Sequence, residues 1–161
     1  MILFLSLLLA VAPGASTVNL SGVWEMNKAK SQAAPNQPDA LRIRIEHKGD
    51  ELAMTFRIVT KGNTKGNTKT QVYKYLVGQQ TRNAGDGLAI VSNTECDGEV
   101  LVVRSVANFG DKEFRFTDRG TLSERGAILS LHEVRKLGSD PEEGETRVFE
   151  KKPADSWKSG K

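Results

Sequence analysis

Apolar and polar residues alternate along this 161-residue chain in short runs that are separated by turn-forming residues. In residues 41–48 (LRIRIEHK), Leu41, Ile43 and Ile45 face one way and the charged residues between them face the other. A two-residue period is the signature of a half-buried β-strand. Regularly spaced strands of this kind predict an all-β sandwich or barrel. Similar strand-like runs occur at residues 21–27, 51–60, 68–77, 88–96, 99–107, 112–122, 127–136 and 145–151.

The turns between these runs are short enough to predict the connectivity. Asp97-Gly98 separates two alternating runs, and Asp-Gly is a strong hairpin signal because both residues tolerate positive φ. Connections made only of hairpins favour an up-and-down antiparallel meander. Closing the meander removes both exposed edges. We therefore expect a single barrel of about eight to ten strands, whose interior either fills with side chains or holds one small ligand.

The composition excludes several kinds of functional site. The chain has one cysteine, Cys96, so it forms no intrachain disulfide and no cysteine-based zinc site. Its two histidines, His47 and His132, exclude a three-histidine metal site, and the net charge of +3 gives no argument for nucleic-acid binding. The sequence has no G-x-S-x-G elbow, P-loop or dinucleotide fingerprint. We predict no catalytic residue, no metal site and no enzymatic activity.

The N-terminus has the pattern of a targeting segment. Residues 2–12 are uncharged and almost entirely apolar, and small residues follow at 13–16. A secretory signal has an apolar stretch of about 7–15 residues before small residues, whereas a membrane span needs about 20. We predict a signal peptide over residues 1–16, a barrel domain over 17–152 and a flexible basic tail over 153–161. The protein would then be secreted or periplasmic without a stable membrane anchor; the alternative is a buried N-terminal strand or helix.

Two features near the ends of the predicted barrel carry a family resemblance. Gly22-Val23-Trp24 is a G-x-W in the first strand, and Arg147 lies in the last one. Residues 20–152 resemble the lipocalin-like branch of the calycin superfamily, and are similar to small exported lipocalin-like proteins of environmental bacteria. The resemblance implies that Trp24 closes one end of the barrel and that Arg147 packs over its indole. We therefore expect Gly22, Trp24 and Arg147 to form a structural group at the barrel end. The segments shared with those bacterial proteins are SGVWEMNKAKS, KGDEL, CDGEVLVV, TLSERGAIL and VFEKK.

Several aromatic and apolar residues are candidates for lining a cavity. Tyr73 and Tyr75 share one face of a strand, and Phe114 and Phe116 share one face of another. Such rings either fill a core or line a site in which hydroxyls orient a ligand. The core interpretation is the simpler one, and a binding site would require a cavity of about 300–1,000 Å³. The candidate ligand-binding residues are Met54, Phe56, Tyr73, Tyr75, Phe114 and Phe116.

The titratable residues support only weaker hypotheses. His132, in a late strand, could ligate haem as in haem-binding relatives of the resembled family, although a surface or hydrogen-bonded histidine is the simpler interpretation. His47 adjoins a turn and is expected to face solvent. Cys96 is expected to be buried, since cysteine is among the most buried residue types. The carboxylates of Asp118, Glu133, Glu142 and Glu143 could pair across loops, but a solvated surface explains them equally well.

These observations lead to three functional hypotheses. The first is a monomeric, exported barrel that binds a small hydrophobic or amphipathic ligand in its cup. The alternative is an exported interaction module or enzyme inhibitor, in which the barrel is filled and the loops bind an unknown protein partner. The third is an enzyme or a haem protein on the same barrel. The resemblance favours the first, and no cofactor is predicted apart from the haem alternative at His132.

Overall fold

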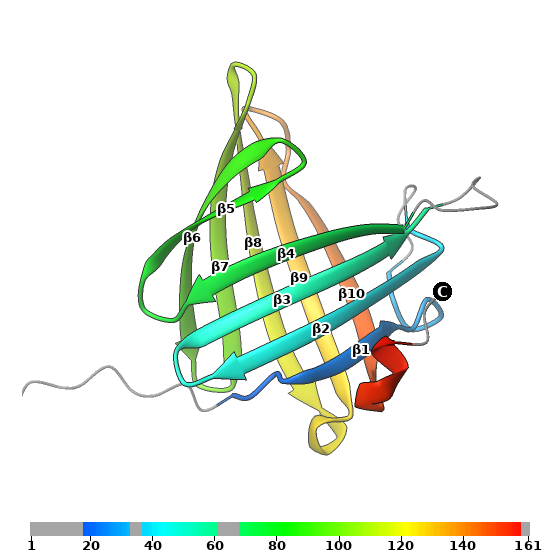
Figure 1. The fold of residues 1–161 in the computed structure, drawn as a ribbon. Coiled ribbons are helices and arrows are strands. Elements are labelled where there is room, and N and C mark those ends of the chain that lie inside the picture. Colours follow the sequence, from blue (N-terminus) through cyan, green and yellow to red (C-terminus); the bar gives the residue numbers. More distant parts are fainter. Residues whose placement is uncertain (1–17, 33–36, 61–67, 159–161) are drawn as a thin grey trace, which may run out of the picture.

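The computed structural model describes residues 18–32, 37–60 and 68–158, which form one antiparallel β-barrel (Figure 1). Neighbouring strands follow one another along the chain, in the order β4-β3-β2-β1-β10-β9-β8-β7-β6-β5. The predicted all-β, up-and-down architecture is therefore confirmed. The ten strands are β1 (Gly22–Met26), β2 (Ala40–Lys48), β3 (Glu51–Val59), β4 (Thr68–Leu76), β5 (Gln80–Gly85), β6 (Leu88–Asp97), β7 (Val100–Phe109), β8 (Lys112–Ser123), β9 (Ile128–Leu137) and β10 (Glu143–Lys152).

The first and last strands join the two halves of the meander. β1 pairs with β10 in a register that runs from Val23 opposite Lys152 to Met26 opposite Phe149. The edges of the sheet are β4 and β5, which are linked by side-chain bonds instead of a ladder. The backbone N–H of Lys74 donates to Oδ1 of Asn83 at 2.7 Å, and Nδ2 of Asn83 donates to the Lys74 carbonyl at 2.9 Å. The barrel is therefore nearly closed.

Strand β5 is the element that the hydrophobic pattern misses. The sequence pattern predicts a loop over residues 78–87, because Gln80–Gly85 (QTRNAG) has no apolar alternation. The strand forms because Asp86 and Gly87 have positive φ values of 52° and 78°. Two successive residues with positive φ make the turn that a tight hairpin prefers. The hairpin places β5 beside β6 across six residue pairs.

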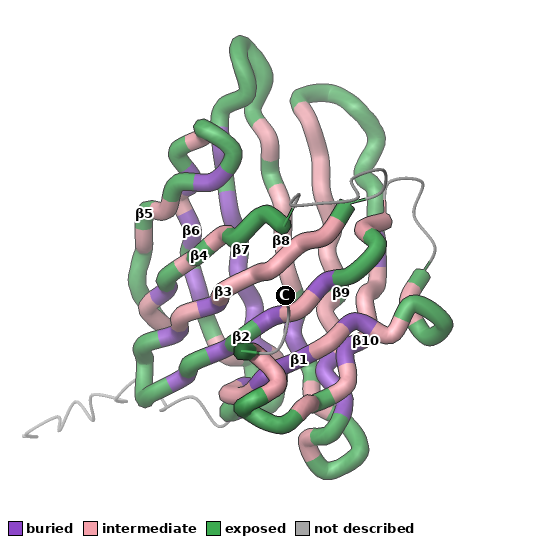
Figure 2. The backbone as a smooth tube through the Cα atoms, turned by 45° about the vertical axis from the view of Figure 1, so that its right-hand side comes forward, coloured by how far each residue is buried: buried purple, intermediate pink, exposed green. Residues whose placement is uncertain are grey.

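One end of the barrel is filled with apolar side chains. Trp24 is fully buried there, and its Nε1 donates to the carbonyl of Leu20 at 3.0 Å. Buried positions are frequent on β1, β2 and β7, whereas the hairpins projecting at the top of Figure 2 are exposed. We call this filled end the barrel floor, and strands from both halves of the meander contribute to it. Its fully or almost fully buried members include Leu20, Trp24, Ile43, Ile45, Leu52, Leu129 and Phe149.

The cation over Trp24 comes from a residue other than the one expected. Nζ of Lys151 lies 5.3 Å from the centroid of the indole ring, because Lys151 is directly opposite Trp24 in the β1–β10 register. Arg147 is four residues earlier on β10, which places it about 13 Å further along the strand. The expected Trp24–Arg147 contact is therefore wrong. A Cβ on Gly22 would lie 2.9 Å from Cε of Lys151, so the glycine makes room for the lysine side chain.

The segment after β10 is packed against the barrel wall. Residues 153–161 are expected to be a flexible tail, but Ala154–Trp157 forms a short 3-10 helix, η2. Cζ of Arg57 lies 4.4 Å from the centroid of the Trp157 ring, and Nη1 of Arg57 donates to the Trp157 carbonyl at 2.9 Å. Arg42 adds a bond to the Ser156 carbonyl. These contacts attach η2 to the outer face of β2 and β3.

The predicted signal peptide, residues 1–16, lies outside the described residues. Within the described part of the chain, no helix has the length and apolar character needed to cross a membrane. Cys96 is only partly buried, although it packs against the edge of the core.

The two tryptophans provide a test of the barrel floor. Trp24→Ala should lower the free energy of unfolding by about 3–5 kcal/mol, because it leaves a cavity in the buried floor. Trp157→Ala should cost less than about 2 kcal/mol, because that ring packs on the outer wall and mainly loses its contact with Arg57. Urea denaturation followed by circular dichroism measures both values. Equal losses for the two variants would contradict the assignment of Trp24 to the floor.

Candidate functional site

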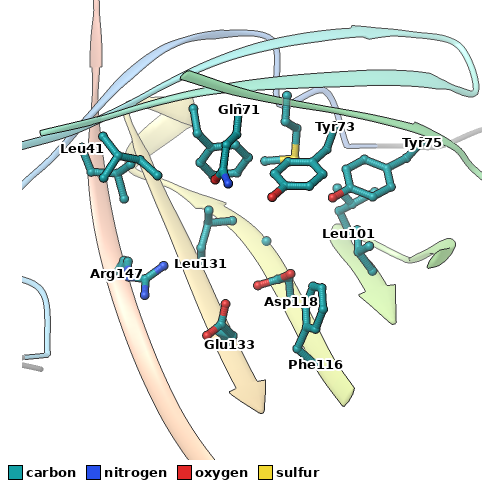
Figure 3. A pocket seen from close by; sticks show the side chains of 15 residues that line it. Leu41, Gln71, Tyr73, Tyr75, Leu101, Phe116, Asp118, Leu131, Glu133 and Arg147 are labelled. Atoms are coloured by element: carbon teal, nitrogen blue, oxygen red, sulfur yellow. The ribbon is translucent and has the colours of Figure 1, made fainter. Parts of the chain in front are cut away.

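A cavity of about 200 Å³ lies inside the barrel above the apolar floor (Figure 3). Its wall is mainly apolar and aromatic, with a group of charged side chains on β8, β9 and β10. The volume is smaller than the predicted range of about 300–1,000 Å³, because large aromatic side chains occupy part of the interior. The lining residues are Leu41, Met54, Phe56, Ile58, Gln71, Tyr73, Tyr75, Leu101, Val103, Phe116, Asp118, Gly120, Leu131, Glu133 and Arg147.

Most of the predicted lining residues do face this cavity. The exception is Phe114, which packs on Phe116 with ring centroids 5.2 Å apart but lines a separate depression beside Arg135 and Pro141. Phe114 is nearer the end of β8, where the barrel wall opens. The predicted residues found at the cavity are Met54, Phe56, Tyr73, Tyr75 and Phe116.

The aromatic wall is built on β3 and β4. Phe56 meets Tyr73 edge-on at a centroid distance of 5.7 Å, and Tyr73 stacks on Tyr75 at 6.4 Å. The Tyr73 ring also approaches β5 closely. A Cβ on Gly85 would lie 2.5 Å from the Tyr73 hydroxyl oxygen and 3.2 Å from Cδ1 of Ile90. Gly85 is therefore the residue that makes room for this ring between β4 and β5.

Three acidic residues lie side by side on the opposite wall. Asp118 on β8 is directly opposite Glu133 on β9, and Glu133 is directly opposite Glu145 on β10. Directly opposed residues of an antiparallel pair have Cβ atoms about 4.5–5.5 Å apart, and like charges in such pairs are destabilising. We call Asp118, Glu133 and Glu145 the carboxylate row. Two of its members, Asp118 and Glu133, line the cavity (Figure 3).

Two arginines neutralise part of the negative charge. Arg147 makes a bidentate pair with Glu145, with Nε–Oε1 and Nη2–Oε2 distances of 2.8 and 3.0 Å. Arg135 binds Glu143 through Nε and Nη2 at 3.2 and 3.0 Å, and its Nη1 lies 3.7 Å from Oε1 of Glu133. Each guanidinium therefore makes its shortest contacts with a carboxylate of β10. Within the described part of the chain, no arginine makes such a bond to Asp118.

The position of Asp118 changes its protonation. Burial raises the pKa of its carboxyl to about 7, and the neighbouring Glu133 adds to the rise, whereas Arg147 opposes it. Desolvation and a nearby like charge both disfavour the ionised form of an acid. Asp118 thus changes its charge near neutral pH. A carboxylate that titrates in this range inside a cavity marks a candidate functional site.

The tyrosine hydroxyls stay neutral beside this carboxylate. Burial raises the pKa of Tyr73 and that of Tyr75, and the charge of Asp118 contributes to both shifts. Tyr75 is 8% exposed. Nε2 of Gln71, which also lines the cavity, is buried without a hydrogen-bond partner. The cavity wall therefore contains one neutral polar group, the amide nitrogen of Gln71, that no described residue satisfies.

The two histidines lie away from the cavity. His132 is on the outer face of β9, where its Nδ1 is 2.9 Å from Oγ1 of Thr146, so it cannot ligate haem inside the barrel. His47, expected to face solvent, is 6% exposed because it continues the inward alternation of Leu41, Ile43 and Ile45. Its pKa is lowered mainly by burial. Among the described residues, no group of three or more His, Cys, Asp or Glu side chains could hold a metal ion.

The polar part of the site is what the sequence analysis missed. It considered pairing of Asp118 and Glu133 across loops, whereas the β8–β9 ladder brings them together. Glu145 was overlooked, and Arg147 was assigned to the barrel floor. The alternation along each strand does indicate their direction. Asp118 lies on the same face of β8 as Phe116, and both Glu145 and Arg147 lie on the same face of β10 as the buried Phe149.

Comparisons with known proteins relate this chain to others through its fold. No family model and no curated protein sequence matches it. Secretory abundant heat soluble protein 4 from Ramazzottius varieornatus is similar in structure, with a TM-score of 0.56, 13% identity, and coverage of 86% of this chain and 98% of that one. The fluorescent protein UnaG has a TM-score of 0.54 and 13% identity, covering 82% of this chain and 96% of its own.

A fatty acid binding protein from Schistosoma mansoni, solved in complex with arachidonic acid, is a third similar structure. Its TM-score is 0.52 at 8% identity, covering 83% of this chain and 96% of that one. These proteins are calycin or lipocalin-like β-barrels. The chain described here therefore shares the β-barrel fold of these proteins.

The contact between Gly85 and Tyr73 can be tested by substitution. Gly85→Ala should lower the free energy of unfolding by about 1–3 kcal/mol, because the added methyl group overlaps the Tyr73 hydroxyl. Tyr73→Phe in the same chain should recover part of the loss. Gly144→Ala is the control, since no atom lies closer than 3.6 Å to its Cβ position. A loss for Gly144→Ala as large as that for Gly85→Ala would contradict the overlap.

The raised pKa of Asp118 predicts that replacing this residue by asparagine stabilises the protein, by an amount that depends on pH. Because the folded pKa is about 7 and the ordinary value is 3.8, the wild type loses stability as pH rises through this interval. Asp118→Asn has no charge to bury. It should raise the free energy of unfolding at pH 8 by up to about 4 kcal/mol, and change it little at pH 4.

Urea titrations of both proteins at the two pH values measure this difference. Asp111→Asn, on an exposed turn, is the control and should change stability by less than about 0.5 kcal/mol at both pH values. A gain for Asp118→Asn that is the same at pH 4 and pH 8 would contradict a buried, titrating Asp118.

Proposed function

We propose that this protein is an exported binding protein that holds one small amphipathic molecule inside its barrel. The observation that carries the proposal is the cavity above the floor, which has apolar side chains on most of its wall and polar groups concentrated on β8, β9 and β10. Ligand sites are mostly apolar clefts with a few placed polar groups. Export is supported by the apolar N-terminal run and the small residues after it.

The cavity volume limits the size of the molecule. An engineered apolar cavity of about 150 Å³ is large enough to bind benzene. The cavity of about 200 Å³ therefore suits one ring with a short polar substituent. Drug-sized ligands occupy sites of about 300–1,000 Å³. The similarity to a fatty acid binding protein in complex with arachidonic acid supports binding inside the barrel, but the volume argues for a smaller ligand here.

The alternative of an interaction module with a filled barrel has less support. That hypothesis expects side chains to occupy the whole interior, whereas the structure leaves a cavity at the level of Tyr75 and Asp118. Leaving a cavity lowers stability, by about 24 cal/mol for each Å³ in one series of core substitutions. A space that is kept at this cost is better explained by an occupant.

Binding can be tested with 2-phenylethanol, a ring with a short polar chain. In titrations followed by heteronuclear NMR, the wild type should show saturable shifts of the cavity residues, with a dissociation constant of about 1 mM or lower. Leu131→Phe, which adds volume to the cavity wall, should weaken binding at least about tenfold. Val134→Phe is the control, since it introduces the same phenyl ring on the outer face of β9.

Two results would contradict binding of 2-phenylethanol inside the barrel. If 2-phenylethanol shifts only surface residues, or if both phenylalanine variants bind it like the wild type, the cavity is not the site. Circular dichroism of each variant confirms that it is folded before the titration.

A further inference from the structure

We propose that the molecule in this cavity carries a protonated amine, which binds between Asp118 and Glu133 while its apolar body lies against the aromatic wall. This inference rests on the proposed function, because it names the chemical class of the ligand for the same site. The claim is about charge selectivity: the site should prefer a cation to a neutral or anionic molecule of the same size.

The charge balance at the carboxylate row favours a cation. The half-buried Asp118 and Glu133, the buried Glu145 and the exposed Glu143 lie near two guanidiniums on β8, β9 and β10. Both guanidiniums are engaged, Arg147 by Glu145 and Arg135 by Glu143. With all groups ionised, this leaves an excess of two negative charges, at the two members of the row that line the cavity.

The geometry of these two carboxylates suits an ammonium group. Asp118 and Glu133 are directly opposed across the β8–β9 ladder, and both project toward the cavity (Figure 3). An ammonium group has three donors and no acceptor, so it can bond to both carboxylates at once. It would also lie between two like charges whose repulsion Arg147, which acts on both, offsets only in part. Hydrogen bonds between charged groups are stronger than hydrogen bonds between neutral groups.

Tyr75 supplies a second, independent observation. Its side chain is 8% exposed, and its hydroxyl points into the cavity from β4, on the wall opposite Asp118 (Figure 3). Nε2 of Gln71, also on β4, lines the same cavity and is buried without a hydrogen-bond partner among the described residues. A buried polar group without a partner costs about 1–3 kcal/mol, so the β4 wall has polar groups suited to a molecule that fills the site. A hydroxyl oxygen can accept a bond from an ammonium group.

The aromatic residues beside the carboxylates add to the attraction. Tyr73 and Tyr75 are stacked on β4, and Phe116 is two residues from Asp118 on the same face of β8. The face of an aromatic ring attracts a cation within about 6 Å of its centroid. Rings and carboxylates around one small cavity therefore suit an ammonium group attached to an apolar body.

The same arrangement disfavours the other charged ligands. An anionic ligand would have to approach Asp118 and Glu133, and the nearest cation, Arg147, already holds Glu145 through two bonds. A metal ion is disfavoured too, because no group of three or more suitable ligands is arranged for one within the described residues. An organic ammonium ion needs no such coordination shell, since hydrogen bonds and ring faces hold it.

The preference for an amine should depend on pH through Asp118. The charged or titratable groups that face Asp118 are Glu133 on β9, Arg147 on β10, and Tyr73 and Tyr75 on β4. The arginine and tyrosines keep their charge state between pH 5.5 and pH 8. Ionisation of Asp118 over this interval makes the site more negative, so amine affinity should rise with pH. The affinity for a neutral ligand should change much less.

The test compares three compounds that share a phenyl ring and a two-carbon chain: 2-phenylethylamine, 2-phenylethanol and 3-phenylpropanoate. At pH 8 the amine should bind the wild type at least about tenfold more tightly than the alcohol. A tenfold difference in affinity is about the contribution of one hydrogen bond to a charged group. The carboxylate should bind more weakly than the alcohol. At pH 5.5 the advantage of the amine should shrink. NMR titration or calorimetry measures each affinity.

Three variants connect the selectivity to the named residues. At pH 8, Asp118→Asn and Glu133→Gln should each weaken binding of the amine about tenfold, and should weaken binding of the alcohol much less. Circular dichroism of each variant shows that it is folded. Glu142→Gln, an exposed acidic residue in the loop before β10, is the control and should bind all three compounds like the wild type.

The outcomes separate this inference from the proposed function. Binding of none of the three compounds would overturn both. Binding of the alcohol or the carboxylate as tightly as the amine would overturn the inference and leave the proposed function standing. An amine preference that persists unchanged in Asp118→Asn and Glu133→Gln would also overturn the inference, because the selectivity would then come from elsewhere.

Discussion

The pairing of β1 with β10 determines the rest of this structure, because it turns a ten-strand meander into an enclosed interior. Its register places Lys151 opposite Trp24, so the lysine side chain covers the indole at the barrel floor. The same register carries Arg147 about 13 Å up β10 to the level of Leu131. One alignment therefore sets both the height of the apolar floor and the height of the charged residues above it.

The carboxylate row is the least favourable feature of the interior for stability. Three directly opposed acids repel one another. Arg147 makes its bidentate pair with Glu145, and Arg135 approaches Glu133 at 3.7 Å, so the two guanidiniums compensate the row only in part. Apolar side chains at Asp118 and Glu133 would fill the barrel with less repulsion and less desolvation. Local violations of the rules for a stable core concentrate at functional sites. This cost is the physical reason for assigning function to the level of Asp118.

The aromatic residues decide what size of molecule the barrel can hold. Phe56, Tyr73, Tyr75 and Phe116 line the cavity and occupy space that smaller side chains would leave free. The approach of Tyr73 to Gly85 also fills the region between the edge strands β4 and β5. Similarity of fold to proteins with larger ligands is thus compatible with a smaller site, because side-chain volume and not strand number sets the remaining space.

The sequence by itself determined the strands, the hairpins and the side of each strand that faces inward, because these follow from local alternation and turn residues. Tyr75 and Phe116 were found in this way, whereas β5 was missed because QTRNAG has no apolar alternation. Only the tertiary structure decided which inward residues meet. The strand registers brought Asp118, Glu133 and Glu145 into one row and put Lys151, in place of Arg147, over Trp24. The physical reason is that alternation fixes the direction of a side chain, whereas its neighbours depend on registers between strands far apart in the chain.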